Sequence, residues 1–261
     1  MRTSILGLSA LALAAIATPA FAQDDDGLGL TITGGATVVS DYRFRGVSQS
    51  DEDFAIQGSF TVTHASGFYA GVWGSSNTVG AGQGTEIDVI GGFSHELVPG
   101  LTGDVGVTYY VYPNKLQTLA ANELVEPYAA LSGTVGPVWG KVGFAWAPKQ
   151  DYFTLAGKRY DNTYLWGDAS VGIPSTPIKL TGHVGWTSNG YLRGTYADAT
   201  TSRADVIDFG VGATASYKAL TFGVNFVSTD VPSRYAIREG VPGSNLLASD
   251  STVVFSVGAA F

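Results

Sequence analysis

The chain has 261 residues, with 22 acidic against 14 basic side chains and a formal net charge of −8. Only 14% of the residues are charged, against roughly 25% in soluble domains, while 45% are hydrophobic and 12% aromatic. Cysteine is absent, which excludes disulfides and thiolate metal sites as sources of stability.

The first 22 residues, MRTSILGLSALALAAIATPAFA, have the pattern of a secretory signal peptide. Arg2 precedes an apolar core over residues 5–17, and an A-x-A pattern ends at Ala22. This arrangement predicts cleavage after Ala22, because export signals combine these three features. The apolar core is too short to be a spanning helix. We therefore expect one exported domain over residues 23–261.

Beyond Ala22, apolar and polar residues alternate in short segments, and no segment approaches the roughly 18 continuous apolar residues that a transmembrane helix needs. A period of two is typical of β-strands, and the 35 glycines are typical of the turns between them. The pattern predicts twelve strands, over residues 28–42, 54–64, 67–75, 85–97, 101–112, 123–135, 137–147, 163–173, 178–188, 204–217, 220–229 and 251–261.

The connections between these strands alternate in length. Short ones cover residues 64–67, 97–100, 135–138, 173–177 and 217–220, and long polar ones cover 43–53, 76–84, 113–122, 148–162, 189–203 and 230–250. Up-and-down membrane barrels have short periplasmic turns and longer outer loops, and an even strand number returns both termini to the periplasmic side.

The faces of the strands indicate which side meets lipid. Ile178, Leu180 and Val184 share one face of their strand, whereas Lys179 and His183 share the other. In a soluble barrel the apolar face would be the core, and in a membrane barrel it would face lipid. Aromatic residues favour the second interpretation, because they cluster near both strand ends, as interfacial girdles do: Tyr42, Phe44, Phe54, Tyr109, Trp146, Trp186 and Phe226 near long loops, and Phe68, Phe93, Tyr217 and Phe261 near short turns. We predict an all-β fold, a transmembrane up-and-down antiparallel β-barrel of about 12 strands in a bacterial outer membrane.

Ionisable residues within the strands fall on the polar face, which a membrane barrel turns toward its lumen. The predicted pore-lining residues are Asp41, Arg43, Glu86, Asp88, Asp104, Glu126, Lys141, Asp168, Lys179, His183 and Asp208. Their acidic excess predicts a weak preference for cations, since charges in a narrow wet tube set ion preference. In the alternative, these charges pair across the strands and plug the lumen.

The stretch VVSDYRFRGVSQSDED, Val38 to Asp53, is interpreted as a strand that passes from lipid into water. Tyr42 and Phe44 are expected in the outer aromatic girdle. Asp41, Arg43 and Arg45 are expected at the mouth of the lumen, and residues 47–53 form the first outer loop.

The last strand, STVVFSVGAAF, ends on an aromatic residue, Phe261. This ending resembles the C-terminal signature by which outer-membrane barrels are recognised by assembly machinery, although an ordinary edge strand can also end this way. The expected partners are therefore outer-membrane lipids and lipopolysaccharide, the barrel-assembly machinery through Phe261, and small hydrophilic solutes. No nucleic-acid partner, cofactor or metal is expected.

Residues 40–76 resemble the N-terminal region of the TorF-like putative porins, a proteobacterial family. The resemblance rests on S-D-Y-x-F-R-G at Ser40–Gly46, S-Q-S at Ser48–Ser50 and S-G-F-Y-A-G-V-W at Ser66–Trp73. It implies an outer-membrane barrel with a pore function, and it supplies no catalytic residues.

The expected function is passive diffusion of small hydrophilic solutes or ions through a narrow channel, without enzymatic activity. One alternative is a plugged structural or adhesive barrel that acts through its outer loops. A second is an outer-membrane lipid hydrolase, but His183 is expected to face the lumen and has no recognisable serine partner. The stretch GAGQG, residues 80–84, lacks the helix that a phosphate loop requires.

Overall fold

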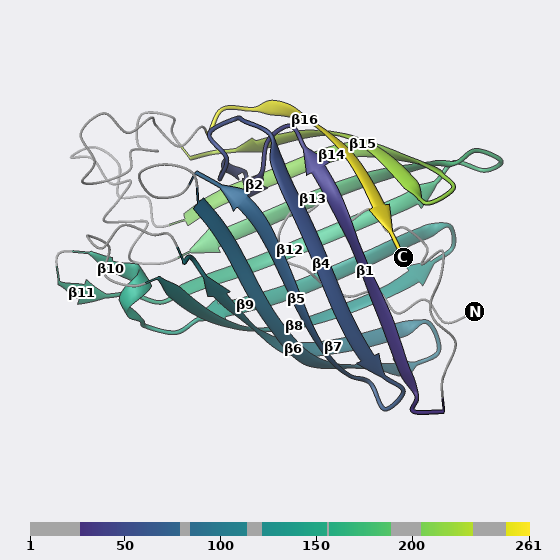
Figure 1. Cartoon of the computed structure of the whole chain (residues 1–261), viewed down its shortest axis with the longest axis horizontal. Helices are drawn as coiled ribbons and strands as arrows, with labels where there is room; N and C mark the ends of the chain where they lie inside the picture. Colours follow the sequence, from purple (N-terminus) through teal and green to yellow (C-terminus); the bar gives the residue numbers. More distant parts are fainter. Residues whose placement is uncertain (1–26, 79–83, 114–121, 156, 189–204, 232–248) are drawn as a thin grey trace.

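The structure, a computed structural model, describes residues 27–78, 84–113, 122–155, 157–188, 205–231 and 249–261. Within these ranges, twelve strands form a closed barrel in which every neighbouring pair is antiparallel (Figure 1). The wall strands are β1 (Leu30–Val39), β4 (Ala55–His64), β5 (Phe68–Asn77), β6 (Gly84–Val98), β7 (Leu101–Val111), β8 (Glu123–Val135), β9 (Val138–Ala147), β12 (Asn162–Gly172), β13 (Ile178–Ser188), β14 (Asp205–Tyr217), β15 (Leu220–Thr229) and β16 (Thr252–Ala260). The predicted fold class is confirmed.

The last strand closes the barrel against the first. Strand β16 pairs with β1 from Gly35↔Ala260 to Val39↔Ser256, and Phe261 N donates to Gly34 O at 2.9 Å. The C-terminal end of the chain lies at the end of the barrel where the short turns are (Figure 1). Closure removes the two free strand edges that an open sheet would expose.

The outward face of the wall is apolar. Phe60, Val142 and Phe255 are 43%, 60% and 60% exposed, and they alternate with buried or half-buried inward residues. So large an exposed apolar surface marks contact with lipid, because soluble monomers rarely expose contiguous apolar patches of more than a few hundred Å². The interpretation as a soluble barrel is thereby excluded. None of the described residues forms a helix long and apolar enough to cross a membrane.

The two ends of the barrel differ in their connections. The five short turns link β4 to β5, β6 to β7, β8 to β9, β12 to β13 and β14 to β15, and they lie together at what we call the short-turn end (Figure 1). The opposite end is the long-loop end. Exposed aromatic residues occur near both, such as Phe54 and Trp146 at the long-loop end and Phe68 and Tyr217 at the short-turn end.

Two long connections contain small elements that the sequence pattern did not predict. Residues 148–162 hold η1 (Asp151–Phe153), β10 (Thr154–Leu155) and β11 (Lys158–Arg159). The first connection holds β2 (Arg43–Phe44) and β3 (Val47–Ser48), which pair with each other and with no wall strand. The prediction that the first strand continues to residue 42 is wrong, because β1 ends at Val39.

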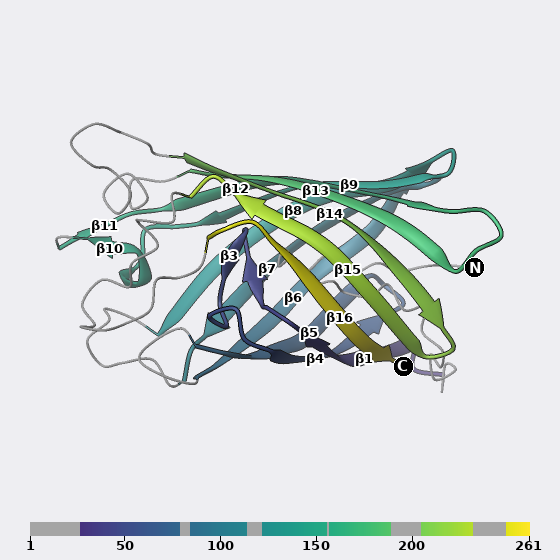
Figure 2. The same cartoon turned by 90° about the horizontal axis from the view of Figure 1, so that it is seen from above.

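The β2–β3 hairpin stands inside the barrel. Viewed from above, its two short arrows lie between the walls and extend from the side of β1 toward the opposite side (Figure 2). Tyr42 is 1% exposed and Phe44 is half-buried, so the prediction that they belong to a lipid-facing girdle is wrong. We call residues 41–50 the lumen hairpin.

Candidate functional site

The sequence predicted a set of lumen-facing ionisable residues, and the structure places nine of them on inward positions of wall strands. They come from seven strands: Glu86 and Asp88 from β6, Asp104 from β7, Glu126 from β8, Lys141 from β9, Asp168 from β12, Lys179 and His183 from β13, and Asp208 from β14. The two remaining predicted residues, Asp41 and Arg43, lie in the lumen hairpin instead of the wall.

Asp41 and Arg43 hold the base of the hairpin together. Arg43 Nε donates to Asp41 Oδ2 at 2.5 Å, and Ser48 Oγ donates to Asp41 Oδ1 at 2.6 Å. Arg43 also donates to Glu52 Oε1 at 3.2 Å. Both members of the pair are nearly inaccessible, with exposures of 5% and 2%. The contacts of this pair are those of a structural ion pair within the hairpin.

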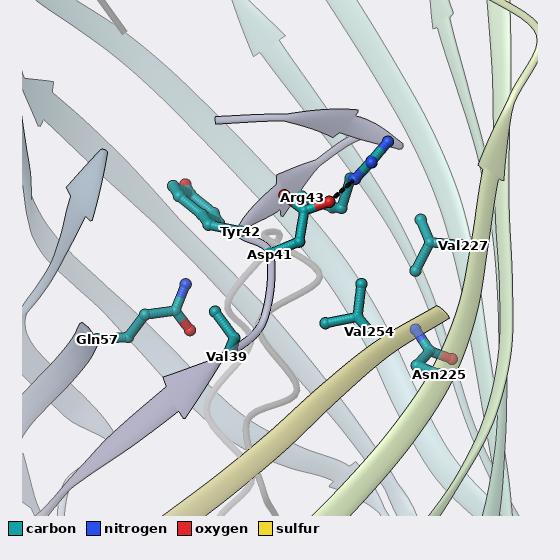
Figure 3. Close-up of a pocket in the computed structure, with 8 residues that line it drawn as sticks. All are labelled: Val39, Asp41, Tyr42, Arg43, Gln57, Asn225, Val227 and Val254. Atoms are coloured by element: carbon teal, nitrogen blue, oxygen red, sulfur yellow. Dashed lines mark hydrogen bonds and ion pairs between the residues drawn. The ribbon is translucent and has the colours of Figure 1, made fainter. Parts of the chain in front are cut away.

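A small pocket separates the base of the hairpin from the wall. Figure 3 shows the Asp41–Arg43 pair above it and apolar side chains of β1, β15 and β16 around it. Its lining consists of Val39, Asp41, Tyr42, Arg43, Gln57, Asn225, Val227 and Val254. The buried residues Val39, Val227 and Val254 pack together with Tyr42. The hairpin is thus seated on a small apolar cluster inside the lumen.

The tip of the hairpin is a two-residue turn, Arg45–Gly46. Both residues have positive φ, 49° and 81°, as the tight turns that match the twist of a hairpin require. A Cβ atom on Gly46 would lie 2.5 Å from Thr229 Cβ and 3.1 Å from Asp208 Cβ. Glycine is therefore needed here both for the backbone conformation and for the close approach to β14 and β15.

Arg45 reaches the far wall of the barrel. Its Nη2 donates to both carboxylate oxygens of Glu126, at 2.7 and 2.9 Å, and its Nη1 donates to Asn162 Oδ1 at 2.9 Å. Its guanidinium carbon lies 4.1 Å from the ring centre of Tyr164 and 4.8 Å from that of Phe44. Burial alone would lower the pKa of Arg45, but the Glu126 charge and hydrogen bond together with Tyr110 and Tyr164 outweigh burial, and the net shift of the pKa is upward.

Other hairpin residues contact further parts of the wall. Tyr42 Oη donates to Glu86 Oε2 at 3.0 Å, and its ring lies 5.5 Å from that of Trp73. Phe44 packs edge-on against Tyr110, and their ring centres are 6.3 Å apart. Together with Arg45 and Gly46, these residues contact β5, β6, β7, β8, β12, β14 and β15. The hairpin therefore crosses the lumen.

A second polar cluster is centred on His183. Its Nδ1 lies 2.7 Å from Asp168 Oδ1, and its Nε2 lies 2.9 Å from Asp208 Oδ1 and 3.0 Å from Tyr164 Oη. Both ring nitrogens thus have carboxylate partners inside the barrel. This environment fits a buried ion-pair network, and it places His183 away from the lipid face where a lipid hydrolase would need it.

A third cluster links three neighbouring inward positions. Tyr69 donates to Asp104 Oδ1 at 2.7 Å and is hydrogen bonded to Tyr128. Nearby, the Lys141 ammonium lies 5.8 Å from the ring centre of Trp166. In this cluster the charges are therefore mixed with aromatic rings. Lys141 is 8% exposed, and the other side chains of the cluster are 7% exposed or less.

The inward positions near the short-turn end are different. Seven of them carry small hydroxyl side chains, each half-buried, and we call these seven residues the short-turn rim: Thr33, Thr61, Ser94, Thr102, Ser132, Thr181 and Thr214. The half-buried Lys179 also faces inward at this end. In the described part of the chain, no group of three or more His, Asp or Glu side chains is arranged to hold a metal ion.

Sequence reasoning missed the residues at the centre of this site. Arg45 was expected at the lumen mouth but not among the pore-lining residues, and Tyr42, Phe44, Asn162 and Tyr164 were not assigned to the lumen site. The sequence did contain a sign of the hairpin. Arg45–Gly46 lies between Arg43–Phe44 and Val47–Ser48, and each of these pairs has one polar and one apolar residue, as the two arms of a hairpin with a two-residue turn can have. The stretch at residues 80–84 lies mostly outside the described residues.

The closed barrel, its apolar outer face and its charged lumen define a transmembrane β-barrel of the bacterial outer-membrane type. The chain belongs to the family described as "Bacterial protein of unknown function (Gcw_chp)", whose sequence model matches residues 23–261. The TorF-like assignment is not confirmed by this match.

Solved structures of porins share the fold, the NanC and KdgM porins among them. The NanC porin is similar with a TM-score of 0.55 and 14% sequence identity, covering 88% of this chain and 98% of that chain. The KdgM porin is similar with a TM-score of 0.52 and 9% identity, with the same coverage. At such low identity these similarities concern the fold alone. Among curated proteins, no sequence matches this chain.

Proposed function

We propose that this protein is an outer-membrane channel for passive diffusion of small hydrophilic solutes or ions, with a weak preference for cations and no enzymatic activity. The observation that carries the proposal is the lining of the lumen. Six acidic residues, Glu86, Asp88, Asp104, Glu126, Asp168 and Asp208, face inward from the wall, against the two lysines Lys141 and Lys179. The porin fold and the resemblance to TorF-like putative porins support the same function.

Asp168 is the strongest candidate for a residue that attracts cations. Its side chain is 31% exposed, whereas the other five inward acids are 7% exposed or less. A carboxylate that meets water keeps its charge at little cost, because it is not stripped of its hydration. A charged carboxylate facing the lumen favours the entry of cations over anions.

The test is the reversal potential of single channels in planar bilayers under a potassium chloride gradient. The wild-type protein should show a reversal potential of the sign expected for cation selectivity, and Asp168→Asn should move this potential toward zero. Asp151→Asn removes an exposed acid from the outer connection and should leave it unchanged. An anion-selective potential in the wild type would refute the cation preference.

A plugged barrel is the second candidate, and the packing of the lumen hairpin favours it. The hairpin contacts most of the wall, and Asp41, Tyr42 and Arg43 are 5% exposed or less. A plug would be supported if the wild-type protein shows no conductance at any potential or with any solute, and a variant with a shortened hairpin does conduct. Conductance of the unmodified protein would support the channel.

A lipid hydrolase is the weakest candidate because His183 faces the lumen and both its ring nitrogens have carboxylate partners. Purified protein should not release fatty acid from phospholipid vesicles, and His183→Ala should make no difference. The proposed partners are outer-membrane lipids and lipopolysaccharide around the apolar face, and the barrel-assembly machinery through Phe261, which is 51% exposed.

A further inference from the structure

The surroundings of the Arg45 guanidinium have the features of a ligand site. Glu126 accepts two hydrogen bonds from it, Asn162 accepts one, and the Tyr164 ring lies against its face. A paired carboxylate, an amide oxygen and an aromatic face are the groups that recognise a planar guanidinium. All three residues belong to the wall, so they remain in place when the hairpin moves.

One hydrogen bond to the carboxylate of this pocket comes from the wall and not from the hairpin. Tyr110 Oη, on the neighbouring strand, donates to Glu126 Oε2 at 3.1 Å. Glu126 is 2% exposed, Asn162 is 4% exposed and Tyr164 is 1% exposed. Arg45 contributes to this burial, but the wall residue Tyr110 also orients the Glu126 carboxylate, as a preformed binding site requires.

Arg45 fills this pocket imperfectly. Its Nε has no hydrogen-bond partner among the described residues, although it is buried. A buried donor without a partner weakens an interaction, because it loses its bond to water and gains none in return. The tether also restrains the approach, since Arg45 sits on a turn whose φ of 49° is uncommon for a residue other than glycine. A free guanidinium is not subject to either restriction.

We propose that the pocket formed by Glu126, Asn162 and Tyr164 binds solutes that carry a guanidinium group, and that Arg45 occupies it as an internal substitute for the solute. Binding of the solute displaces Arg45 and releases the lumen hairpin from the far wall. The inference rests on the proposed channel function, because the solute reaches the pocket through the lumen.

Charge favours the solute once Arg45 has left. The pocket then retains the carboxylate of Glu126, whose charge Arg45 no longer neutralises. An ammonium group would be attracted by the same charge, but it lacks the second nitrogen that reaches Asn162 while the first contacts Glu126, and the planar face that stacks on Tyr164. The pocket should therefore discriminate guanidinium from simple alkylammonium ions.

The experiment measures the potassium conductance of single channels before and after addition of guanidinium chloride or ethylammonium chloride. About 20 mM is suitable, because a short tether presents its own group at an effective concentration on the order of millimolar. In the wild type, guanidinium should raise the conductance severalfold, whereas ethylammonium should change it only as ionic strength does.

Two variants separate the pocket from a general salt effect. Glu126→Gln should abolish the response to guanidinium. Arg45→Ala should start at a higher conductance, and guanidinium should then lower it, because the solute enters a pocket that is already vacant. Arg159→Ala, which removes an exposed arginine paired with Asp151, should behave as the wild type.

Hydrogen exchange of the peptide covering residues 41–50 provides a second measurement that does not depend on conductance. Guanidinium should accelerate exchange in the wild type and not in Glu126→Gln. Channels that conduct but respond equally to guanidinium and ethylammonium would overturn the pocket and leave the channel function intact. If no variant conducts, the channel function fails, and the exchange experiment still decides the pocket: acceleration by guanidinium alone supports it, and no acceleration overturns it.

Discussion

The outer part of the lumen and the short-turn rim are built by the same strands but differ in their contents. In the outer part, the lumen hairpin contacts carboxylates and aromatic rings that are almost fully buried. At the rim, the inward positions carry half-buried Ser and Thr. The difference shows that alternation along a strand determines which side chains face inward, whereas the hairpin determines whether those side chains meet water.

Burial changes what the charges must do. A buried charge has to be paired, because desolvation is costly and removal of one partner leaves the other uncompensated. Arg43 with Asp41 and Arg45 with Glu126 satisfy this requirement in the outer part. The neutral hydroxyl groups at the rim have no such requirement. Substitutions in the outer part should therefore have much larger effects than equivalent ones at the surface or at the rim.

The largest effect on stability is expected for Arg43→Glu. The change places a third carboxylate beside Asp41 and Glu52, and loss of a buried pair costs about 3–5 kcal/mol. The matched control Arg159→Glu breaks an exposed pair and should cost about 1 kcal/mol or less. Urea unfolding followed by tryptophan fluorescence measures both. Equal losses, or a shift in ion selectivity without loss of stability, would contradict the structural assignment of Arg43.

A smaller effect is expected for Gly46→Ala. The positive φ and the contact with Thr229 should together make the docking of the hairpin against the wall less favourable by about 1–3 kcal/mol. The conductance should rise because the tip no longer fits against the wall. Gly172→Ala is the control at the short-turn end, since nothing lies within 4 Å of its added Cβ, and it should change neither stability nor conductance. Equal changes in stability and conductance in the two variants would contradict the difference between the outer part of the lumen and the short-turn end.

Within the lumen hairpin, the smallest effect is expected for Tyr42→Phe, which removes one hydrogen bond to Glu86 and leaves the ring packing intact. The expected loss is about 1 kcal/mol, because Tyr112 still donates to the same carboxylate. Thr181→Val at the rim should change the free energy of unfolding by about 0.5 kcal/mol at most. Chemical denaturation of both variants checks the order.

The sequence allowed the wall to be predicted because each wall strand follows a simple rule. Residues such as Leu180 and Lys179 alternate, and their faces follow from the period of two. The nine wall charges were assigned to the lumen for the same reason. The strand order required only that each strand pair with the next along the chain.

The lumen hairpin could not be predicted in this way. Asp41, Tyr42, Arg43 and Phe44 alternate as a wall strand would, and alternation does not reveal which backbone supplies the hydrogen-bond partners. Here the strand partner of Phe44 is Val47, three residues later in the hairpin, and not a residue of a neighbouring wall strand. The pocket around Arg45 combines residues from β8, β12 and the hairpin, so it depends on distances that a strand pattern does not contain.

The most direct test of the account replaces Arg43–Ser48 with two glycines. Gln49 N donates to Tyr42 O at 2.6 Å, so a two-residue turn can join these positions and leave the wall unchanged. The single-channel conductance of this variant should be severalfold higher than that of the wild type. Guanidinium should no longer raise this conductance. An unchanged conductance in a correctly folded variant would contradict the claim that the lumen hairpin constricts the channel.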